Sequence, residues 1–212
     1  YETFAREIVD LSLDKEKRDS FAKKLYERAS QLYSIENMAA RQEEIYNNIC
    51  RMKKEKGRKG VLICGAYGRG NSGDEAILEA IISTMREIDD IMPITVMTRK
   101  PRETEVLHFV RGVYTFNIFK FIPAMLGAKL FISGGGSLIQ NVTSTRSLMF
   151  YLFSIWAAKI CGCKVLMYGC GIGEVNGGMP RKLTKGIIDK YTDIISVRDS
   201  RSIEEIAEMG IK

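Results

Sequence analysis

The spacing of apolar residues changes near Gly60 in this chain of 212 residues. Upstream of that point apolar residues recur every three or four positions, first within residues 21–32 and again from Met38 to Ile49, after Ser34 as an expected N-cap. No strand pattern accompanies these two predicted helices. Their apolar faces lack a partner of their own, so we expect an N-terminal helical segment that packs on something else.

Downstream of Gly60, short apolar runs alternate with amphipathic stretches. The runs predict strands at residues 61–65, 94–98, 113–116, 129–133, 164–168 and 193–197. The stretches between and after them predict helices at residues 74–88, 102–110, 117–126, 146–161, 181–190 and 200–209. Such alternation is typical of an α/β fold, a Rossmann-like parallel sheet with helices on both faces. We therefore divide the chain into a helical segment (1–55), a basic linker (56–60) and an α/β lobe (61–212).

Composition and charge add few constraints. Apolar residues make up 45% and charged residues 27%, as in ordinary globular proteins. The net charge is +6, and its one local concentration is Arg51–Lys59, with six basic residues and one acid. This stretch fits a solvated linker or a contact with anionic lipid at the inner membrane face. No nucleic-acid motif accompanies it, so we expect no nucleic-acid partner.

The histidine, the cysteines and the length of the apolar runs bear on metal binding and on the cellular location of the protein. His108 is the only histidine, and the five cysteines include no CxxC pair, so we expect core thiols and no metal site. No apolar run reaches about 18 residues, so we expect no membrane span and a cytoplasmic location, with the membrane surface as the alternative.

Ligands of parallel sheets bind beyond the carboxyl ends of the strands, and the glycine clusters of this chain all fall there. The loop after the first strand is long and leads into a helix, which suits an anion. It also fits a tight turn with a cap. Its candidate binding residues are Gly68, Gly70, Asn71, Ser72 and Gly73. Asp74 is the candidate catalytic carboxylate, although a capping role explains it nearly as well.

The spacing Gly68-x-Gly70-x-x-Gly73 also matches the dinucleotide fingerprint, but the second strand ends at Arg99 without the required acid. The missing acid disfavours NAD. NADP remains an alternative ligand of this loop. We expect no cofactor.

Three further loops follow later strands. Their polar groups and bare backbone suit a sugar or a phosphate, and arginines could offset anionic charge. A purely structural role, such as a capped loop or an ion pair of Arg198 with Asp199 or Asp193, is the alternative. The candidates are Ser133, Gly134, Gly135, Gly136, Ser137, Gln140, Asn141, Thr143, Arg146, Gly171, Gly173 and Arg198. We expect the loops Gly68–Asp74 and Ser133–Asn141 to lie side by side.

Four segments occur in one order: YGRGNSGDEAIL (67–78), SGGGSLIQNVTSTRSLMFYL (133–152), YGCGIG (168–173) and ISVRDSRS (195–202). Together they resemble the polysaccharide pyruvyl transferase family, in particular its branch acting on secondary cell-wall polymers. The resemblance implies one lobe of a two-lobed GT-B-like fold, phosphoenolpyruvate as donor, and a lipid-linked or polymeric saccharide as acceptor.

The chain departs from the family pattern at three positions. Asn141 stands where the family often has Asp, and Cys170 and Glu174 stand where it often has Gln and Pro. Asn141 cannot act as a base or bind a metal as a carboxylate would.

Residues 32–39 and 44–46 resemble the C-terminal tail of a GT-B glycosyltransferase, which would make the parent a fusion. The chain begins with Tyr1, and the family's second lobe, with its basic residues and histidine, has no counterpart after Lys212. We therefore expect a fragment that is inactive alone. Two alternatives remain open: a lobe of a sugar-nucleotide glycosyltransferase, and a non-catalytic nucleotide-binding module.

Overall fold

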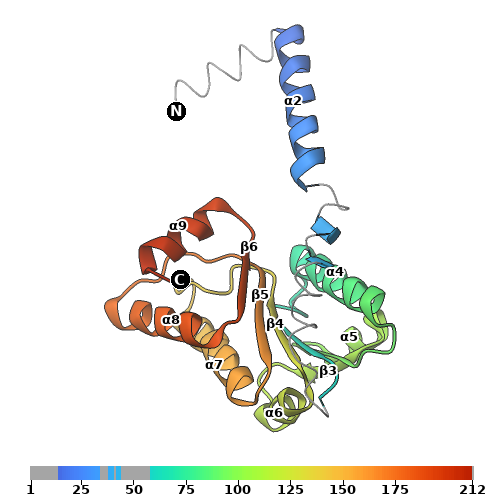
Figure 1. Ribbon diagram of the computed structural model, residues 1–212, viewed down its shortest axis with the longest axis vertical. Helices are drawn as coiled ribbons and strands as arrows, with labels where there is room; N and C mark the ends of the chain where they lie inside the picture. Colours follow the sequence, from blue (N-terminus) through green and yellow to red (C-terminus); the bar gives the residue numbers. More distant parts are fainter. Residues whose placement is uncertain (1–13, 34–37, 41, 44–57, 212) are drawn as a thin grey trace. The chain divides into compact units, whose positions relative to one another are not determined.

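The computed structural model describes residues 14–33, 38–40, 42–43 and 58–211. The chain divides into two compact units, residues 1–53 and 54–212. The larger unit is an α/β domain built on one six-stranded sheet, in the order β3-β2-β1-β4-β5-β6 (Figure 1). Every neighbouring pair of strands is parallel. This is a doubly wound order, in which β2 and β3 lie on one side of β1 and β4 to β6 lie on the other. The strand order therefore reverses between β1 and β4. The predicted Rossmann-like fold class is confirmed.

The strands are short and mostly buried. Their bounds are β1 Val61–Cys64, β2 Ile94–Thr98, β3 Arg111–Tyr114, β4 Leu130–Gly134, β5 Lys164–Cys170 and β6 Ile194–Val197. All residues of β1 and β4 are buried, as expected of central strands covered on both faces. β5 extends two residues beyond the prediction, because Cys170 pairs with Val197 after a register shift.

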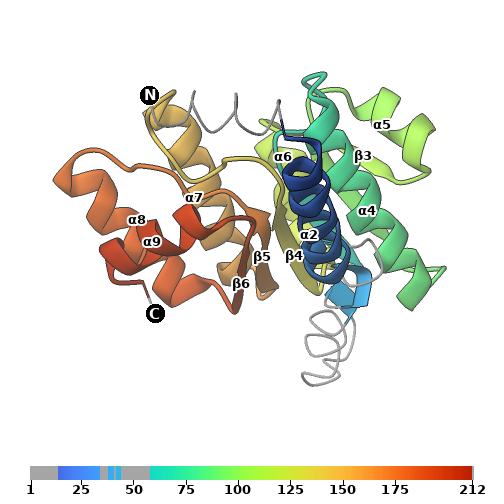
Figure 2. The same cartoon turned by 90° about the horizontal axis from the view of Figure 1, so that it is seen from above.

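Helices cover both faces of the sheet (Figure 2). On one face lie α4 (Ser72–Ile88) and α5 (Pro101–His108), and on the other lie α6 (Ile118–Gly127), α7 (Thr145–Ile160) and α8 (Gly178–Tyr191). The last helix, α9 (Ser200–Met209), contacts α8 and β6. The six helices predicted after Gly60 are all present. Their bounds shift by up to three residues, most at α8, which begins at Gly178 rather than Arg181.

The long helices α4 and α7 each bury a set of apolar side chains. In α4 this set comprises Leu78, Ile81, Ile82 and Met85. Spacings of three and four place these side chains on one side of the helix, against the sheet. Among the described residues, every buried hydrophobic side chain lies between Val61 and Ile211. The α/β domain therefore has a core of its own.

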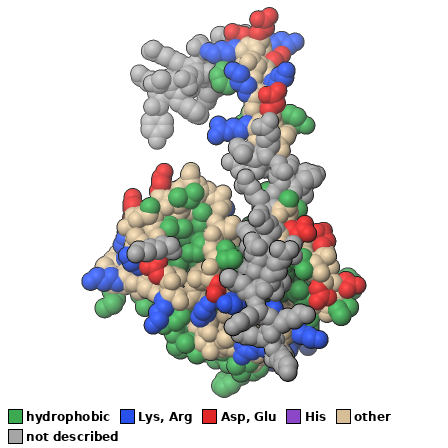
Figure 3. All heavy atoms as spheres, in the orientation of Figure 1, with side chains coloured by type: hydrophobic (Ala, Val, Ile, Leu, Met, Phe, Trp, Pro, Cys, Tyr) green, Lys and Arg blue, Asp and Glu red, His purple; other side chains and the backbone are tan. Residues whose placement is uncertain are grey.

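The smaller unit contains α2 (Lys15–Tyr33). Acidic and basic side chains both line this helix (Figure 3), and Phe21, Leu25 and Tyr26 are 54%, 70% and 74% exposed. The predicted apolar face is thus present and uncovered in the described part of the helix. Residues 38–40 and 42–43 are helical, whereas the expected N-cap Ser34 lies outside the described residues. No helix in the described part of the chain is both long and apolar enough to cross a membrane.

Candidate functional site

The site lies at the point where the strand order reverses. β1 and β4 pair in register, so the loops that leave their carboxyl ends start next to each other. The Tyr67 hydroxyl in the first loop donates a hydrogen bond of 2.7 Å to the carbonyl of Gly134. The prediction that Gly68–Asp74 and Ser133–Asn141 lie side by side is therefore confirmed. In sheets of this kind the crevice between two such loops is where ligands bind.

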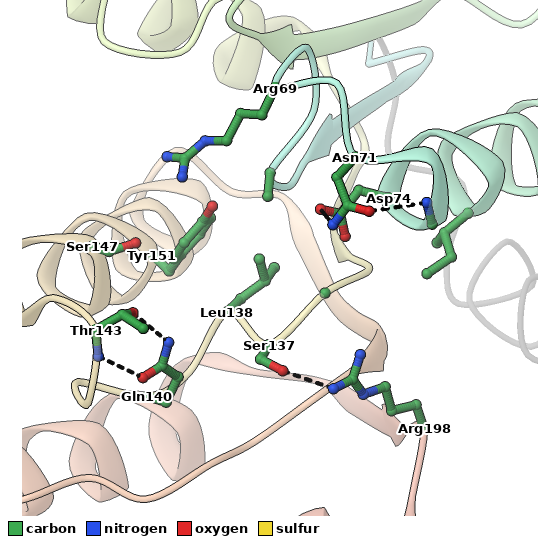
Figure 4. Close-up of a pocket in the computed structure, with 14 residues that line it drawn as sticks. Arg69, Asn71, Asp74, Ser137, Leu138, Gln140, Thr143, Ser147, Tyr151 and Arg198 are labelled. Atoms are coloured by element: carbon green, nitrogen blue, oxygen red, sulfur yellow. Dashed lines mark hydrogen bonds between the residues drawn. The ribbon is translucent and has the colours of Figure 1, made fainter.

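A cavity of about 470 Å³ opens between these loops (Figure 4). Arg69 and Arg198 enter it from opposite sides, and the apolar side chains of Ile77 and Leu138 form part of its wall. The complete lining is Ala66, Arg69, Asn71, Gly73, Asp74, Ile77, Gly136, Ser137, Leu138, Gln140, Thr143, Ser147, Tyr151 and Arg198. Hydroxyls, amides, two guanidinium groups and one carboxyl thus converge on one space.

Asp74 sits in the first turn of α4 and is only 6% exposed. The side-chain amide of Asn71 donates to its Oδ2 at 2.8 Å, while Asn71 also caps the helix by accepting from Gly73 N at 3.1 Å. Burial raises the pKa of Asp74, and the hydrogen bond from Asn71 and the charges of Arg198 and Arg69 oppose this rise only in part. The carboxyl is therefore better able to hold a proton than an exposed aspartate.

The glycines of the second loop allow this close approach. Gly136 has a φ of +64°, and a Cβ atom there would lie 2.8 Å from Oδ1 of Asp74. A side chain at this position would both strain the backbone and displace the carboxyl. The triple glycine therefore brings bare backbone next to the candidate carboxylate.

Arg198 reaches the cavity from the end of β6. Its Nη2 donates to Ser137 Oγ at 2.7 Å, and its Nε donates to Asp199 Oδ2 at 3.1 Å. Both sequence interpretations of Arg198, the cleft and the ion pair with Asp199, are thus correct together. Asp193 has other partners, Lys159 and Lys164.

Two side chains stiffen the second loop. Gln140 accepts from Thr143 N and donates to Thr143 Oγ1 at 2.7 Å, so both line the cavity in a fixed position. Asn141 instead uses its amide on the backbone of Asn176, donating to its carbonyl at 2.8 Å and accepting from its N–H at 2.7 Å. Asn141 thus holds two loops together and does not line the cavity.

Comparison with known proteins identifies the family. A model of the polysaccharide pyruvyl transferase family matches residues 71–212, which include all the lining residues except Ala66 and Arg69. The chain belongs to the polysaccharide pyruvyl transferase family. No curated protein and no solved structure matches it. The family places this pyruvyl transferase domain among transferases that act on polysaccharides.

Some predicted site residues of the pyruvyl transferase domain lie elsewhere. Arg146 lines a neighbouring cavity, and Gly171 and Gly173 line a shallow recess that also contains Ser137, Gln140 and Arg198. Seven predicted binding residues line neither the cavity at Asp74 nor the neighbouring cavity at Arg146. They are Gly68, Gly70, Ser72, Ser133, Gly134, Gly135 and Asn141. Cys170, at a position where the family often has Gln, is fully buried and its Sγ donates to the Ser133 carbonyl at 3.0 Å, so it is a packing residue.

Six lining residues were not among the sequence candidates: Ala66, Arg69, Ile77, Leu138, Ser147 and Tyr151. Arg69 and Leu138 stand inside the two glycine-rich loops, so their positions in the sequence could have identified them as site candidates. Tyr151 and Ser147 lie within α7, and only the folded sheet brings that helix to the cavity. Burial raises the pKa of Tyr151, while Arg69 and Arg99 oppose the rise, so its hydroxyl stays protonated near neutral pH.

The described residues of the pyruvyl transferase domain contain no group of three His, Cys, Asp or Glu side chains that could hold a metal ion. The chemistry that the cavity itself can supply is proton transfer at Asp74, charge stabilisation by the two arginines, and hydrogen bonding to hydroxyl groups.

Proposed function

We propose that this domain serves the transfer of a pyruvate ketal from phosphoenolpyruvate to a lipid-linked or polymeric saccharide. One observation carries the proposal beyond family membership: a carboxyl with a raised pKa lies between two arginines in a cavity whose other polar lining groups are hydroxyls and amides. A saccharide offers hydroxyls to such groups, and a phosphate ester brings negative charge to the arginines.

The reaction has to move two protons and release phosphate. The methylene carbon of the enol takes one proton and becomes a methyl group. Two saccharide hydroxyls add to the central carbon, the bond from that carbon to the phosphate oxygen breaks, and phosphate leaves. The hydroxyls release two protons, one equivalent to that taken by the methyl group and one that leaves with phosphate. General acid–base catalysis by a carboxyl whose pKa is raised suits these transfers.

Within the cavity we assign roles by chemistry. Asp74 exchanges the proton with a saccharide hydroxyl. Ser137, Gln140 and Thr143 are placed to hydrogen-bond the ring hydroxyls, and Arg198 stabilises negative charge that develops as phosphate leaves. The family resemblance supports a second, basic lobe as the main holder of the donor, so we propose that residues 61–212 mainly contact the acceptor and are inactive alone.

The proposal includes a cytoplasmic location, where phosphoenolpyruvate is made. It also includes a contact of Arg51–Lys59 with anionic lipid at the inner membrane face, since clusters of this kind are attracted there. Residues 51–57 lie outside the described residues, so the support for this contact is the sequence.

The test is an assay of the protein as the cell makes it, with phosphoenolpyruvate and an undecaprenyl-type diphosphate disaccharide or the cell-wall polymer. We expect phosphate release coupled to a pyruvate ketal, identified by NMR of the saccharide. Asp74→Asn should reduce the rate by about 100-fold or more, the usual contribution of a general acid or base. Asp90→Asn, an exposed aspartate in the loop before β2, is the matched control and should keep full activity. A new glycosidic bond without a ketal, or full activity of Asp74→Asn, would contradict the proposal.

A further inference from the structure

A second cavity of about 500 Å³ lies beside the first and contains three arginines. Arg69 comes from the loop after β1, Arg99 follows β2 directly, and Arg146 stands in the first turn of α7. No aspartate or glutamate lines this cavity, and no ion pair of these three arginines occurs among the described residues. Three like charges facing one space favour an anion between them.

Arg99 is held in place by aromatic contacts. Its guanidinium carbon lies 4.2 Å from the centre of the Phe116 ring, and its Nη1 donates to the Tyr114 hydroxyl at 3.4 Å. Phe116 in turn packs edge-on against Phe150 of α7, with ring centres 5.2 Å apart. A cation over an aromatic face keeps its donors free at the rim of its plane. Arg99 is therefore oriented before any ligand arrives.

Thr115 provides an independent sign of a ligand. This residue lines the cavity directly after β3, is 5% exposed, and its hydroxyl has no hydrogen-bond partner. Its backbone N–H is already used, since it donates to the Thr98 carbonyl at 3.0 Å. A buried hydroxyl without a partner costs free energy, so native proteins seldom keep one without a reason. An oxygen-rich anion in the cavity would accept from it.

The start of α7 completes the cavity. Ser144 caps this helix by accepting from Ser147 N at 3.3 Å, and both residues line the cavity together with Arg146. The first turn of a sixteen-residue helix adds free N–H groups and the positive end of its dipole. Guanidinium forks, a hydroxyl and a helix N-terminus together match the three oxygens of a phosphoryl group.

We propose that Arg69, Arg99, Arg146 and Thr115 form a binding site for a phosphoryl group, distinct from the cavity that contains Asp74. The two cavities share Arg69, Thr143, Ser147 and Tyr151 in their linings, so a ligand bound here lies next to the first cavity. The phosphoryl group has two candidate sources, a phosphorylated sugar and the enolpyruvate donor. Binding here is a property of the domain and would occur whether or not the reaction proposed above is correct.

Titration of the 212-residue chain with inorganic phosphate, by calorimetry at constant ionic strength, tests the site. Arg99→Gln and Arg146→Gln should each weaken binding by about tenfold or more, because a charged hydrogen bond is lost. Arg69 is left unchanged because it lines both cavities. Arg111→Gln is the matched control, since this exposed arginine begins β3 at the amino end of the sheet and should leave binding unchanged.

Thr115→Val separates binding from folding. The variant keeps the shape of the side chain and removes the unpaired hydroxyl, so the thermal midpoint without phosphate should stay equal or rise. Phosphate binding should weaken several-fold. Equal loss of binding in Arg111→Gln and the two site variants would indicate non-specific charge attraction and overturn the proposal. Absence of phosphate binding, or unchanged binding in Thr115→Val, Arg99→Gln and Arg146→Gln, would also overturn it.

Two further titrations identify the source. A sugar 1-phosphate that binds more tightly than inorganic phosphate, and loses that advantage in Arg99→Gln, assigns the site to a phosphorylated saccharide. Phosphoenolpyruvate with the same behaviour assigns it to the donor. Either result supports the phosphoryl site. Both titrations can be interpreted even if no pyruvyl transfer is detected.

Discussion

At the residue scale, folding shifts the pKa of two aspartates of the α/β domain in opposite directions. Asp74 is buried beside one amide donor, and burial raises its pKa. Burial alone would also raise the pKa of Asp193, but Lys159, the Val165 N–H and Lys164 outweigh it and lower the pKa. A buried carboxyl with few hydrogen-bond donors lowers the stability of the fold and gains reactivity in proton transfer. This is the pattern expected of a functional group.

This difference predicts how Asp74→Asn alters stability with pH. A folded-state pKa above the unfolded value means that folding disfavours the ionised carboxylate. The free energy of unfolding of the native chain therefore falls as pH rises from the unfolded pKa through the folded one, and stays lowered above it. The asparagine variant lacks this loss and should be equally or more stable at pH 7, with the two chains converging at low pH. Thermal midpoints between about pH 3 and pH 8 check this. A variant less stable only at neutral pH would show that Asp74 is mainly structural.

At the element scale, helix starts and strand ends together build both cavities. α4 begins with Asn71 as its cap, and α7 begins with Ser144, and each cap is also a lining residue. The β6 end brings Arg198 from the other side of the first cavity. Because parallel strands end at one edge, loops distant in sequence meet there, and the caps of the following helices come with them.

One carboxylate at the start of the edge strand β6 adds side-chain contacts to its backbone pairing with β5. Asp193 Oδ2 accepts from Lys159 Nζ of α7 at 2.6 Å and from Val165 N of β5 at 2.8 Å. Asp193→Asn removes the charge and should lower the free energy of unfolding at pH 7 by about 1–3 kcal/mol. The folded pKa lies below the unfolded one, so this contribution is present above the unfolded pKa and is lost as pH falls through the folded pKa. Urea unfolding of both chains at neutral and acidic pH measures the effect. An unchanged difference in acid would contradict the assigned ion pair.

At the scale of the whole molecule, the sequence predicts the sheet well and the site in part. Apolar runs such as VLIC at 61–64 indicate buried strands, and glycine clusters after them indicate the ligand edge. Arg99 and Thr115 escaped prediction as neighbours of Arg146, because they lie in different βα connections and meet only through the strand order. Asn141 is predicted to bind the ligand, but its side-chain amide instead holds two loops together. That role depends on its contact with Asn176, which no local sequence pattern reveals.

The last prediction concerns independence of the α/β domain. Its buried hydrophobic side chains all come from the described residues after Gly60, and its compact unit begins at Lys54. Phe21, Leu25 and Tyr26 on α2, in the other unit, are exposed. Deleting residues 1–57 should therefore leave one cooperative transition, with a thermal midpoint changed by less than about 4 °C, the shift that roughly 1–2 kcal/mol produces in a domain of this size. Calorimetry of both chains measures it, and phosphate binding by the shortened chain is the control for native structure. Loss of cooperative unfolding would mean that the N-terminal helices belong to the transferase core, and that their likeness to a glycosyltransferase tail is accidental.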